Sequence, residues 1–371
     1  MASAPGKTIL MGEHAVVYGA PALVAAVDLR ARAVVESSGA VPSGHLRVEL
    51  PDLDHDEVLP RSEVLDHARR SRRRWEQFHR SPGRESFARM RGDGPGDLTL
   101  VALGEAMEAA ARPDGGTVNG EGVRVEVRSE IPIGRGFGSS AAVGSAVCLA
   151  WLAREGIERS RAEMEALLME VERRQHGEPS GVDAATILRG GLVWAESSPD
   201  GSGLLLESIS ASADFLRGFR IVDTGSPAES TGEVVSAVRE RRDREPERIG
   251  AALERIREAT VAFRRLLGEV DPAPGDAVEL IRRCERGLEE LGVVPEPVRR
   301  LVRAVEDRGG AAKISGAGAL GSGATGPPGG GLLLVYHPEP EGVRRWPFLE
   351  GLDVLDVRLG APGARVEEVA E

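Results

Sequence analysis

The sequence contains little cysteine, with only Cys148 and Cys284 among 371 residues. The two lie far apart and neither belongs to a C-x-x-C motif, which argues against a disulfide framework and against a zinc site. Free thiols are typical of a reducing compartment, so we expect a cytoplasmic protein.

Long apolar runs and excess positive charge are also missing. The first ten residues lack the apolar core of a signal peptide and no later run could span a bilayer, so we expect neither secretion nor membrane insertion. The formal net charge of −12 argues against nucleic acid or anionic lipid as a partner. The basic stretch Arg69–Arg74 is a local exception, which we interpret as the solvated face of a helix that ends near Trp75 and Phe78.

The composition and patterning predict a folded α+β protein with two domains. Hydrophobic residues make up 41% of the chain and charged residues 29%, which is typical of globular proteins. Because 371 residues exceed one core of ordinary size, we predict two domains sharing a cleft, residues 1–195 and 196–371. Apolar patterning predicts helices at 98–111, 139–153, 161–175, 232–242, 248–269, 275–291 and 295–307, and strands at 22–35, 123–127, 190–194 and 332–336. The polar segment 42–94 is expected to form surface excursions and helices.

The strongest chemical signal is the run IPIGRGFGSS, in which Gly134, Gly136 and Gly138 alternate before Ser139 and Ser140. Glycine lets the backbone approach a ligand closely, and a helix start offers unpaired N–H groups and the positive end of a dipole. The run therefore predicts a phosphate cradle. The alternative is a tight turn with one of the two serines as helix N-cap. A Rossmann site is disfavoured because the last step of G-x-G-x-x-G is missing.

A second block near the start, PGKTILMGEH, places Lys7, Glu13 and His14 in an apolar stretch, where polar groups need partners. Its GKT sequence is not a Walker A motif, because that motif needs a glycine five positions before Gly6, where this chain has Met1.

A third block begins on a helix with Glu172 and His176 and continues through GEPSGVD to Asp183. Glu172 shares a helix face with apolar residues, so its carboxylate points inward, where it requires a cation. Ser180-x-x-Asp183 also matches a capping box, and a capping role and a functional role for Asp183 can hold together. We interpret His176 as a structural residue that closes the helix.

The last block, KISGAGALGSG from Lys313, is a glycine-rich turn between a helix and a strand. Alone, it would be only a loop. If it folds over the first glycine run, the two backbones could enclose a phosphate group.

Together, these segments resemble the GHMP kinases in all three signature blocks and in their order, over most of the chain. The resemblance implies an N-terminal domain of the ribosomal S5 type, a ferredoxin-like C-terminal domain, and a phosphotransferase that uses ATP and Mg²⁺. The blocks Pro5–Leu23 and His176–Asp183 look most like the mevalonate kinases. That similarity implies phosphorylation of the 5-hydroxyl of mevalonate, a step in isoprenoid synthesis, and a homodimer is a family-level expectation.

The resemblance also implies a role for each matching residue. Asp183 would be the catalytic base and Lys7 would stabilise the transferring phosphoryl group. Glu13 and His14 are expected near the substrate. Ser140 and Glu172 would hold Mg²⁺, Gly134, Gly136, Gly138, Ser139 and Ser140 would cradle the ATP phosphates, and Ser315, Gly316, Ala317 and Gly318 would close the site from the second domain.

Two features depart from the family pattern. Phe137 stands where leucine is usual, and the last block continues into a long glycine- and proline-containing loop over residues 319–331 instead of a compact glycine run. The second departure concerns the contacts that close the site.

Several alternatives share the phosphate loop: a phosphomevalonate kinase, another small-molecule or sugar kinase of the superfamily, or the related decarboxylase. Basic residues near the catalytic base would favour a phosphorylated substrate, and Arg135, Arg189 and the Arg69–Arg74 stretch are candidates. A nucleotide-binding sensor without catalysis is a different class of protein. It should lack one of the key charged residues Lys7, Glu172 and Asp183, and all of these are present.

Overall fold

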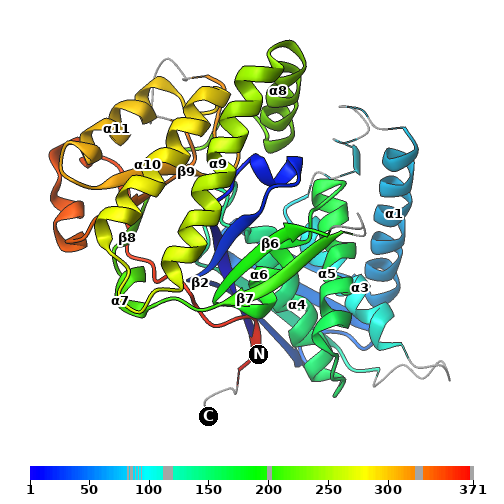
Figure 1. Ribbon diagram of the computed structural model, residues 1–371. Coiled ribbons are helices and arrows are strands. Elements are labelled where there is room, and N and C mark those ends of the chain that lie inside the picture. The colour runs from blue at the N-terminus through cyan, green and yellow to red at the C-terminus, as the bar shows by residue number, and fades with distance from the viewer. Residues whose placement is uncertain are drawn as a thin grey trace.

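The chain folds into two sheets with helices packed on them, and the two halves lie side by side (Figure 1). The computed structural model describes residues 1–81, 83, 87, 89–90, 92, 94–111, 120–198, 203–321 and 329–367. The predicted α+β class is confirmed, because most strands pair antiparallel and the helices pack against the sheets as separate layers. None of the helices in these ranges has the length and apolar character of a membrane span.

The larger sheet has eight strands within the described residues. They are β1 (Ala2–Met11), β2 (Ala22–Ser37), β3 (His45–Leu50), β4 (His55–Pro60), β5 (Val123–Ser129), β6 (Leu192–Ser197), β7 (Leu204–Ile209) and β12 (Arg365–Val366). Their order is β12-β1-β2-β5-β3-β4, with β6 paired to β2 and β7 paired to β6. The sheet branches at the long strand β2, because Ala22–Ala25 pair with β6 and Ala31–Ser37 pair with β5. The β3–β5 pair is parallel.

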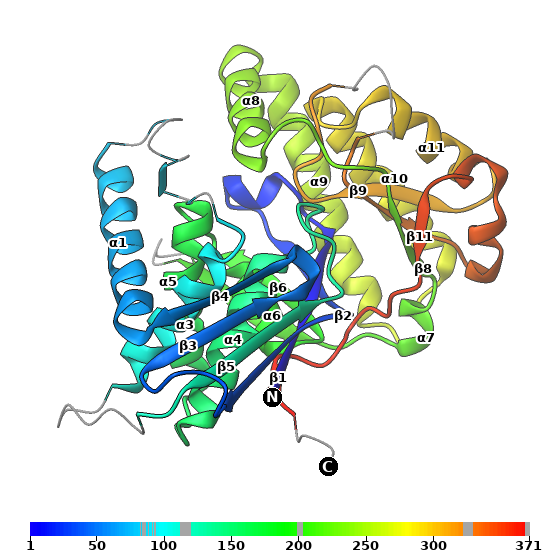
Figure 2. The same ribbon diagram turned by 180° about the vertical axis from the view of Figure 1, so that it is seen from behind.

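Helices cover one face of the larger sheet (Figure 2). They are α1 (Arg61–Arg80), α3 (Asp97–Ala110), α4 (Ser139–Arg154), α5 (Arg161–His176) and α6 (Val182–Arg189), and η1 (Ala15–Tyr18) and η2 (Pro51–Leu53) are short 3₁₀ turns. Helix α4 packs directly on β1 and β2. Its small residues Ala141, Ala142 and Gly144 are buried, and Gly144 faces Val171 and Leu168 of α5. The helix predicted at 139–153 is confirmed, with one more residue at its C-terminal end.

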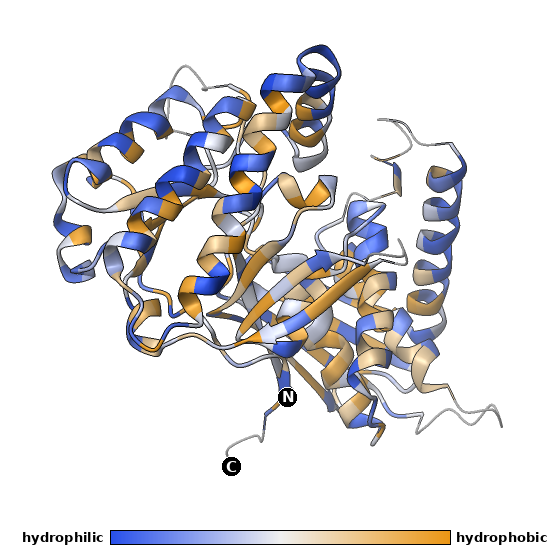
Figure 3. Ribbon diagram, in the orientation of Figure 1, coloured by the Kyte–Doolittle hydropathy of each residue, from blue (hydrophilic) through white to orange (hydrophobic). Residues whose placement is uncertain are grey.

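The polar segment 42–94 is more regular than its sequence predicts. Its first part forms the β3–β4 hairpin at the edge of the larger sheet. Helix α1 follows, and it is hydrophilic over most of its length (Figure 3). The interpretation as a solvated face is correct for Arg70 and Arg73, which are exposed. It is wrong for Arg72, which donates to Glu105 and Glu108 of α3 at 2.7 and 2.9 Å.

The smaller sheet contains β8 (Phe219–Asp223), β9 (Ala311–Ser315), β10 (Leu332–Tyr336) and β11 (Asp353–Leu355) in the antiparallel order β11-β8-β10-β9. In chain order these are the fourth, first, third and second strands, as expected for a ferredoxin-like domain. The helices of this half are α7 (Ala213–Leu216), α8 (Thr231–Arg244), α9 (Pro246–Leu267), α10 (Pro274–Leu291) and α11 (Glu296–Glu306). The 3₁₀ helices η3 (Pro340–Arg345) and η4 (Pro347–Leu349) stand between β10 and β11.

The two halves also contact each other through packed helices and paired strands. Helix α9 packs against β1, β2 and η1, and β12 near the C-terminus returns to pair with β1. Ala2 and Ser3 therefore lie beside Val366 and Arg365 (Figure 1). The predicted boundary between residues 195 and 196 falls inside β6, and β7 still belongs to the larger sheet. The strand pairing therefore favours a domain boundary after β7.

Candidate active site

The glycine run forms a tight loop that ends at the N-terminus of α4. Gly134, Gly136 and Gly138 have φ values of 73°, 93° and 69°, a left-handed conformation that other residues rarely adopt. Gly138 is the N-cap of α4, and no side chain of the described residues caps this helix end. The interpretation of Ser139 or Ser140 as N-cap is therefore wrong. The first N–H groups of α4 remain available to an anion.

Lys7 reaches this loop from β1. Its backbone N–H donates to the Phe137 carbonyl oxygen at 2.8 Å, while the Phe137 ring is fully buried. The lysine stem runs along Gly138, where an added Cβ atom would lie 2.9 Å from Lys7 Cγ. Its Nζ ends 3.1 Å from Asp183 Oδ1, and the lysine side chain is only 8% exposed. Three distant parts of the sequence therefore meet at one point.

Asp183 lies in the first turn of α6. The N-cap of this helix is Gly181 and it has no side-chain cap, while the Ser180 hydroxyl accepts from the N–H of Val182 at 3.4 Å. The capping-box interpretation of Asp183 is therefore wrong. Its carboxylate pairs with Lys7 instead and keeps 35% of its side chain exposed, so a small molecule could reach it.

Glu172 is held in the apolar interior, as its helix face predicts. Its side chain is 3% exposed. Burial raises its pKa to about 8, and the nearby charge of Asp183 adds to this effect, whereas a hydrogen bond with Ser140 opposes it. The buried Oε1 atom of Glu172 has no hydrogen-bond partner among the described residues. Such an atom costs free energy unless a partner binds it. Mg²⁺, which prefers oxygen ligands, fits this carboxylate and the adjacent hydroxyl.

His176 connects these two side chains. Its Nε2 atom lies 3.2 Å from Ser140 Oγ and 3.5 Å from Glu172 Oε2. It is the last residue of α5, as predicted, but a purely structural interpretation misses its contact with both side chains. The i,i+4 spacing of Glu172 and His176 on one helix was the available signal.

Glu13 and His14 lie at the junction with the second half. Glu13 is buried and forms an ion pair with Lys313 of β9. Burial raises the pKa of Glu13, and the charge of Lys313 opposes this shift. The His14 Nε2–H donates to the Ala317 carbonyl oxygen at 2.9 Å, and burial lowers the pKa of His14, so the ring is neutral at pH 7. The role of Lys313 was missed from the sequence, although a lysine within an apolar strand requires a partner.

The second glycine block lies against the first two blocks. Ser315 Oγ is 2.9 Å from Thr8 Oγ1 and accepts from the Ile9 N–H at 3.0 Å. On its other side, a Cβ atom added to Gly136 would lie 3.7 Å from the Ser315 carbonyl oxygen. The two glycine segments are therefore neighbours, as their enclosing a phosphate group would require. Residues 322–328 of the atypical loop lie outside the described residues.

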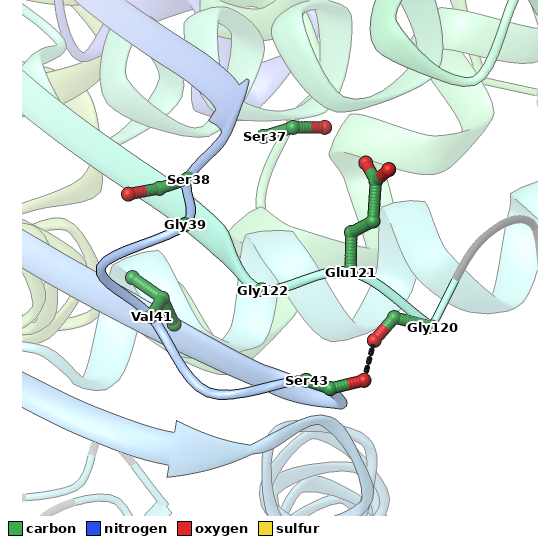
Figure 4. Close-up of a pocket in the computed structure, with 8 residues that line it drawn as sticks. All are labelled: Ser37, Ser38, Gly39, Val41, Ser43, Gly120, Glu121 and Gly122. Atoms are coloured by element: carbon green, nitrogen blue, oxygen red, sulfur yellow. Dashed lines mark hydrogen bonds between the residues drawn. The ribbon is translucent and has the colours of Figure 1, made fainter.

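A separate surface pocket lies at the C-terminal end of β2 (Figure 4). It is lined by Ser37, Ser38, Gly39, Val41, Ser43, Gly120, Glu121 and Gly122. Glu121 is the only ionisable residue of this lining, and none of the predicted site residues belongs to it. The lining contains three glycines but no lysine, arginine or helix N-terminus that would bind phosphate, so this pocket is not the candidate active site.

Comparisons with known proteins agree with this geometry. A family model described as the N-terminal domain of GHMP kinases matches residues 99–191. The mevalonate kinase of Thermococcus onnurineus is 30% identical over 386 residues, which cover all of this chain and 98% of that protein. The mevalonate kinase of Mus musculus is 30% identical over all of this chain and 95% of its own length. The crystal structure of Methanococcus jannaschii mevalonate kinase has a TM-score of 0.74 at 21% identity, covering 97% of this chain and 98% of that one. The fold is therefore the one found in mevalonate kinases.

Proposed function

Because this chain belongs to the mevalonate kinase family of GHMP kinases, we propose that it transfers the γ-phosphoryl group of ATP to the 5-hydroxyl of mevalonate. The products are mevalonate 5-phosphate and ADP. One observation in the site carries the proposal: Lys7 Nζ lies 3.1 Å from Asp183 Oδ1, beside the uncapped N-terminus of α4.

Asp183 and Lys7 divide the chemistry between them in this proposal. The Asp183 carboxylate takes the proton from the substrate hydroxyl, and general-base help of this kind contributes about 10²–10⁴ in rate. Lys7 stabilises the negative charge on the attacking oxygen and on the transferring phosphoryl group. The contact between the two side chains supports these roles, because a substrate hydroxyl bound to Asp183 would also lie near the positive charge of Lys7.

The nucleotide would be held mainly by backbone groups. The Gly134–Ser140 loop presents its N–H groups to the ATP phosphates, and Ser315–Gly318 closes the site from the other half. Mg²⁺ would be held by Ser140 and Glu172, and when bound it neutralises charge on the phosphates. The orphaned Oε1 of Glu172 supports this assignment. Glu13 and His14 are assigned to the substrate side.

The charge pairing of nearby arginines favours an unphosphorylated acceptor. Arg135 lies 3.2 Å from Asp223, and Arg189 lies 2.9 Å from Glu165. In the basic stretch, Arg72 is bound to two carboxylates of α3. A phosphomevalonate kinase would need cations for its substrate phosphate, and these three candidates already have carboxylate partners.

Two further expectations belong to the proposal. We assign the enzyme to the cytoplasm, because Cys148 and Cys284 are both buried free thiols, and we expect a homodimer from the family. The sensor alternative is disfavoured because Lys7, Glu172 and Asp183 converge on one site.

The test is ADP release with ATP and Mg²⁺ against mevalonate, phosphomevalonate, galactose and homoserine in parallel. We expect turnover with mevalonate alone. Asp183→Asn should reduce turnover by about 10²-fold or more while ATP binding remains. Turnover with another acceptor would change the proposed substrate but keep the mechanism. No ADP release with any of the four acceptors would favour the nucleotide-binding sensor. Unchanged turnover in Asp183→Asn would refute the role of Asp183 as base.

A further inference from the structure

Helix α1 touches the loop that joins the proposed metal ligand to the proposed base. This loop, residues 177–181, leaves α5 shortly after Glu172 and enters α6 just before Asp183. The indole Nε1–H of Trp75 donates to the Gly177 carbonyl oxygen at 2.7 Å. The hydrogen bond links the polar segment 42–94 directly to the backbone of the site.

Phe78, one turn further along α1, packs on the same glycine. Gly177 is buried and has a φ of 73°. A Cβ atom added there would lie 2.6 Å from Phe78 Cε1 and 3.2 Å from Cζ. The loop backbone therefore rests on the aromatic ring, at a distance that only glycine permits. Two side chains of one helix thus hold the start of the loop, one by a hydrogen bond and one by contact.

The indole of Trp75 is itself held in place. The guanidinium groups of Arg173 and Arg174 lie 5.3 and 5.6 Å from its ring centroid, a range in which a cation attracts an aromatic face. The His79 ring stacks on it at 5.3 Å with an interplanar angle of 18°. Arg174 is fully buried and pairs with Glu105 of α3 at 3.1 Å. The donor is therefore fixed by α1, α3 and α5 together.

We propose that Trp75 and Phe78 are positioning residues that hold the 177–181 loop, and through it the relative placement of Glu172 and Asp183. The inference rests on the proposed function, because it concerns the geometry of that same site. Both residues act through Gly177. Phosphoryl transfer depends on positioning, and a displacement of about 1 Å at a catalytic group can cost about 10²-fold in rate.

The test is Trp75→Phe, which keeps an aromatic ring for stacking and removes the N–H donor. We expect kcat with mevalonate to fall about fivefold to tenfold, as for the loss of one well-formed hydrogen bond. KM for ATP and for mevalonate should change less than about twofold, because the variant leaves the groups assigned to both ligands in place. Arg69→Gln is the matched control, since it removes an α1–α3 ion pair with Glu108 and does not touch the loop. Its kcat should equal that of the unaltered protein.

A second pair of variants tests Phe78. Gly177→Ala should lower kcat by a larger factor, because its Cβ atom meets the ring. Adding Phe78→Ala to Gly177→Ala should recover part of the loss, although the strain of a positive φ remains. Recovery would be inconsistent with a role of Phe78 in stability alone.

Hydrogen–deuterium exchange of the peptide that contains residues 177–183 gives a readout independent of the substrate. We expect faster exchange in Trp75→Phe and unchanged exchange in Arg69→Gln. If the unaltered protein fails to phosphorylate mevalonate, the proposed function is overturned. The exchange data alone then show whether Trp75 holds the 177–181 loop in place. If mevalonate is phosphorylated but Trp75→Phe matches Arg69→Gln in both kcat and exchange, the positioning role is overturned and the function stands.

Discussion

Replacing Glu172 by glutamine should stabilise the metal-free protein at alkaline pH while removing most of its activity. Burial raises the pKa of Glu172 from an ordinary value of 4.5 to about 8. Between these values the native state holds a proton that the unfolded chain has released. The free energy of unfolding therefore falls as the pH rises from about 5 to about 8.

The size of the effect follows from the shift. At pH 8 the native protein should be less stable by about 4 kcal/mol than it would be with a carboxyl group whose pKa is the same in both states. Water entry and side-chain relaxation around the ionised carboxylate make this figure a ceiling. Glutamine has the same shape and carries no charge, so Glu172→Gln should recover up to that amount at pH 8. At pH 5 the two proteins should differ by less than about 1 kcal/mol.

The assay is urea unfolding in the presence of EDTA at pH 5 and at pH 8. Glu158, an exposed residue of the loop before α5, supplies the control Glu158→Gln, which should leave stability unchanged at both pH values. Added Mg²⁺ and a non-hydrolysable ATP analogue should stabilise the unaltered protein at pH 8 more than Glu172→Gln, because binding to the native state alone adds to stability. If Glu172→Gln lowers stability by the same amount at pH 5 and pH 8, the buried carboxylate carries no ionisation penalty and the reasoning fails.

Two more predictions concern the junction of the halves and the phosphate loop. Lys313→Met leaves the buried Glu13 without its cation and should lower the free energy of unfolding by about 3–5 kcal/mol; denaturant curves should show a smaller loss in Lys313→Met combined with Glu13→Gln, and equal losses would rule out the coupling. Gly138→Ala places a Cβ atom 2.9 Å from Lys7 Cγ at a φ of 69°, which should reduce kcat/KM for ATP about tenfold. Normal kinetics in that variant would show that the loop does not constrain the lysine.

Most helices and several strands were predictable because their signals are local. Helices α9 and α10 were predicted within two residues of their observed bounds, Pro246–Leu267 and Pro274–Leu291, since an amphipathic face repeats along the helix itself. The β3–β4 hairpin was missed. In β3 the buried residues alternate with polar ones over only six positions, whereas β4 places Asp56 and Glu57 side by side and has no fully buried residue. The hairpin also depends on the pairing of β3 with β5, far along the chain.

The sequence by itself determined the chemical character of the site. The alternating glycines and the helix that follows them can be identified from neighbouring residues, and helical periodicity alone directs Glu172 to the apolar side. Tertiary structure decided the partners. Asp183 could have capped its own helix, but packing of α6 near β1 brings it to Lys7. The contact of Trp75 with Gly177 likewise needs α1 to lie on α5. Backbone freedom and periodicity are properties of neighbouring residues, whereas a charge or a donor finds its partner only after distant segments have packed together and excluded water.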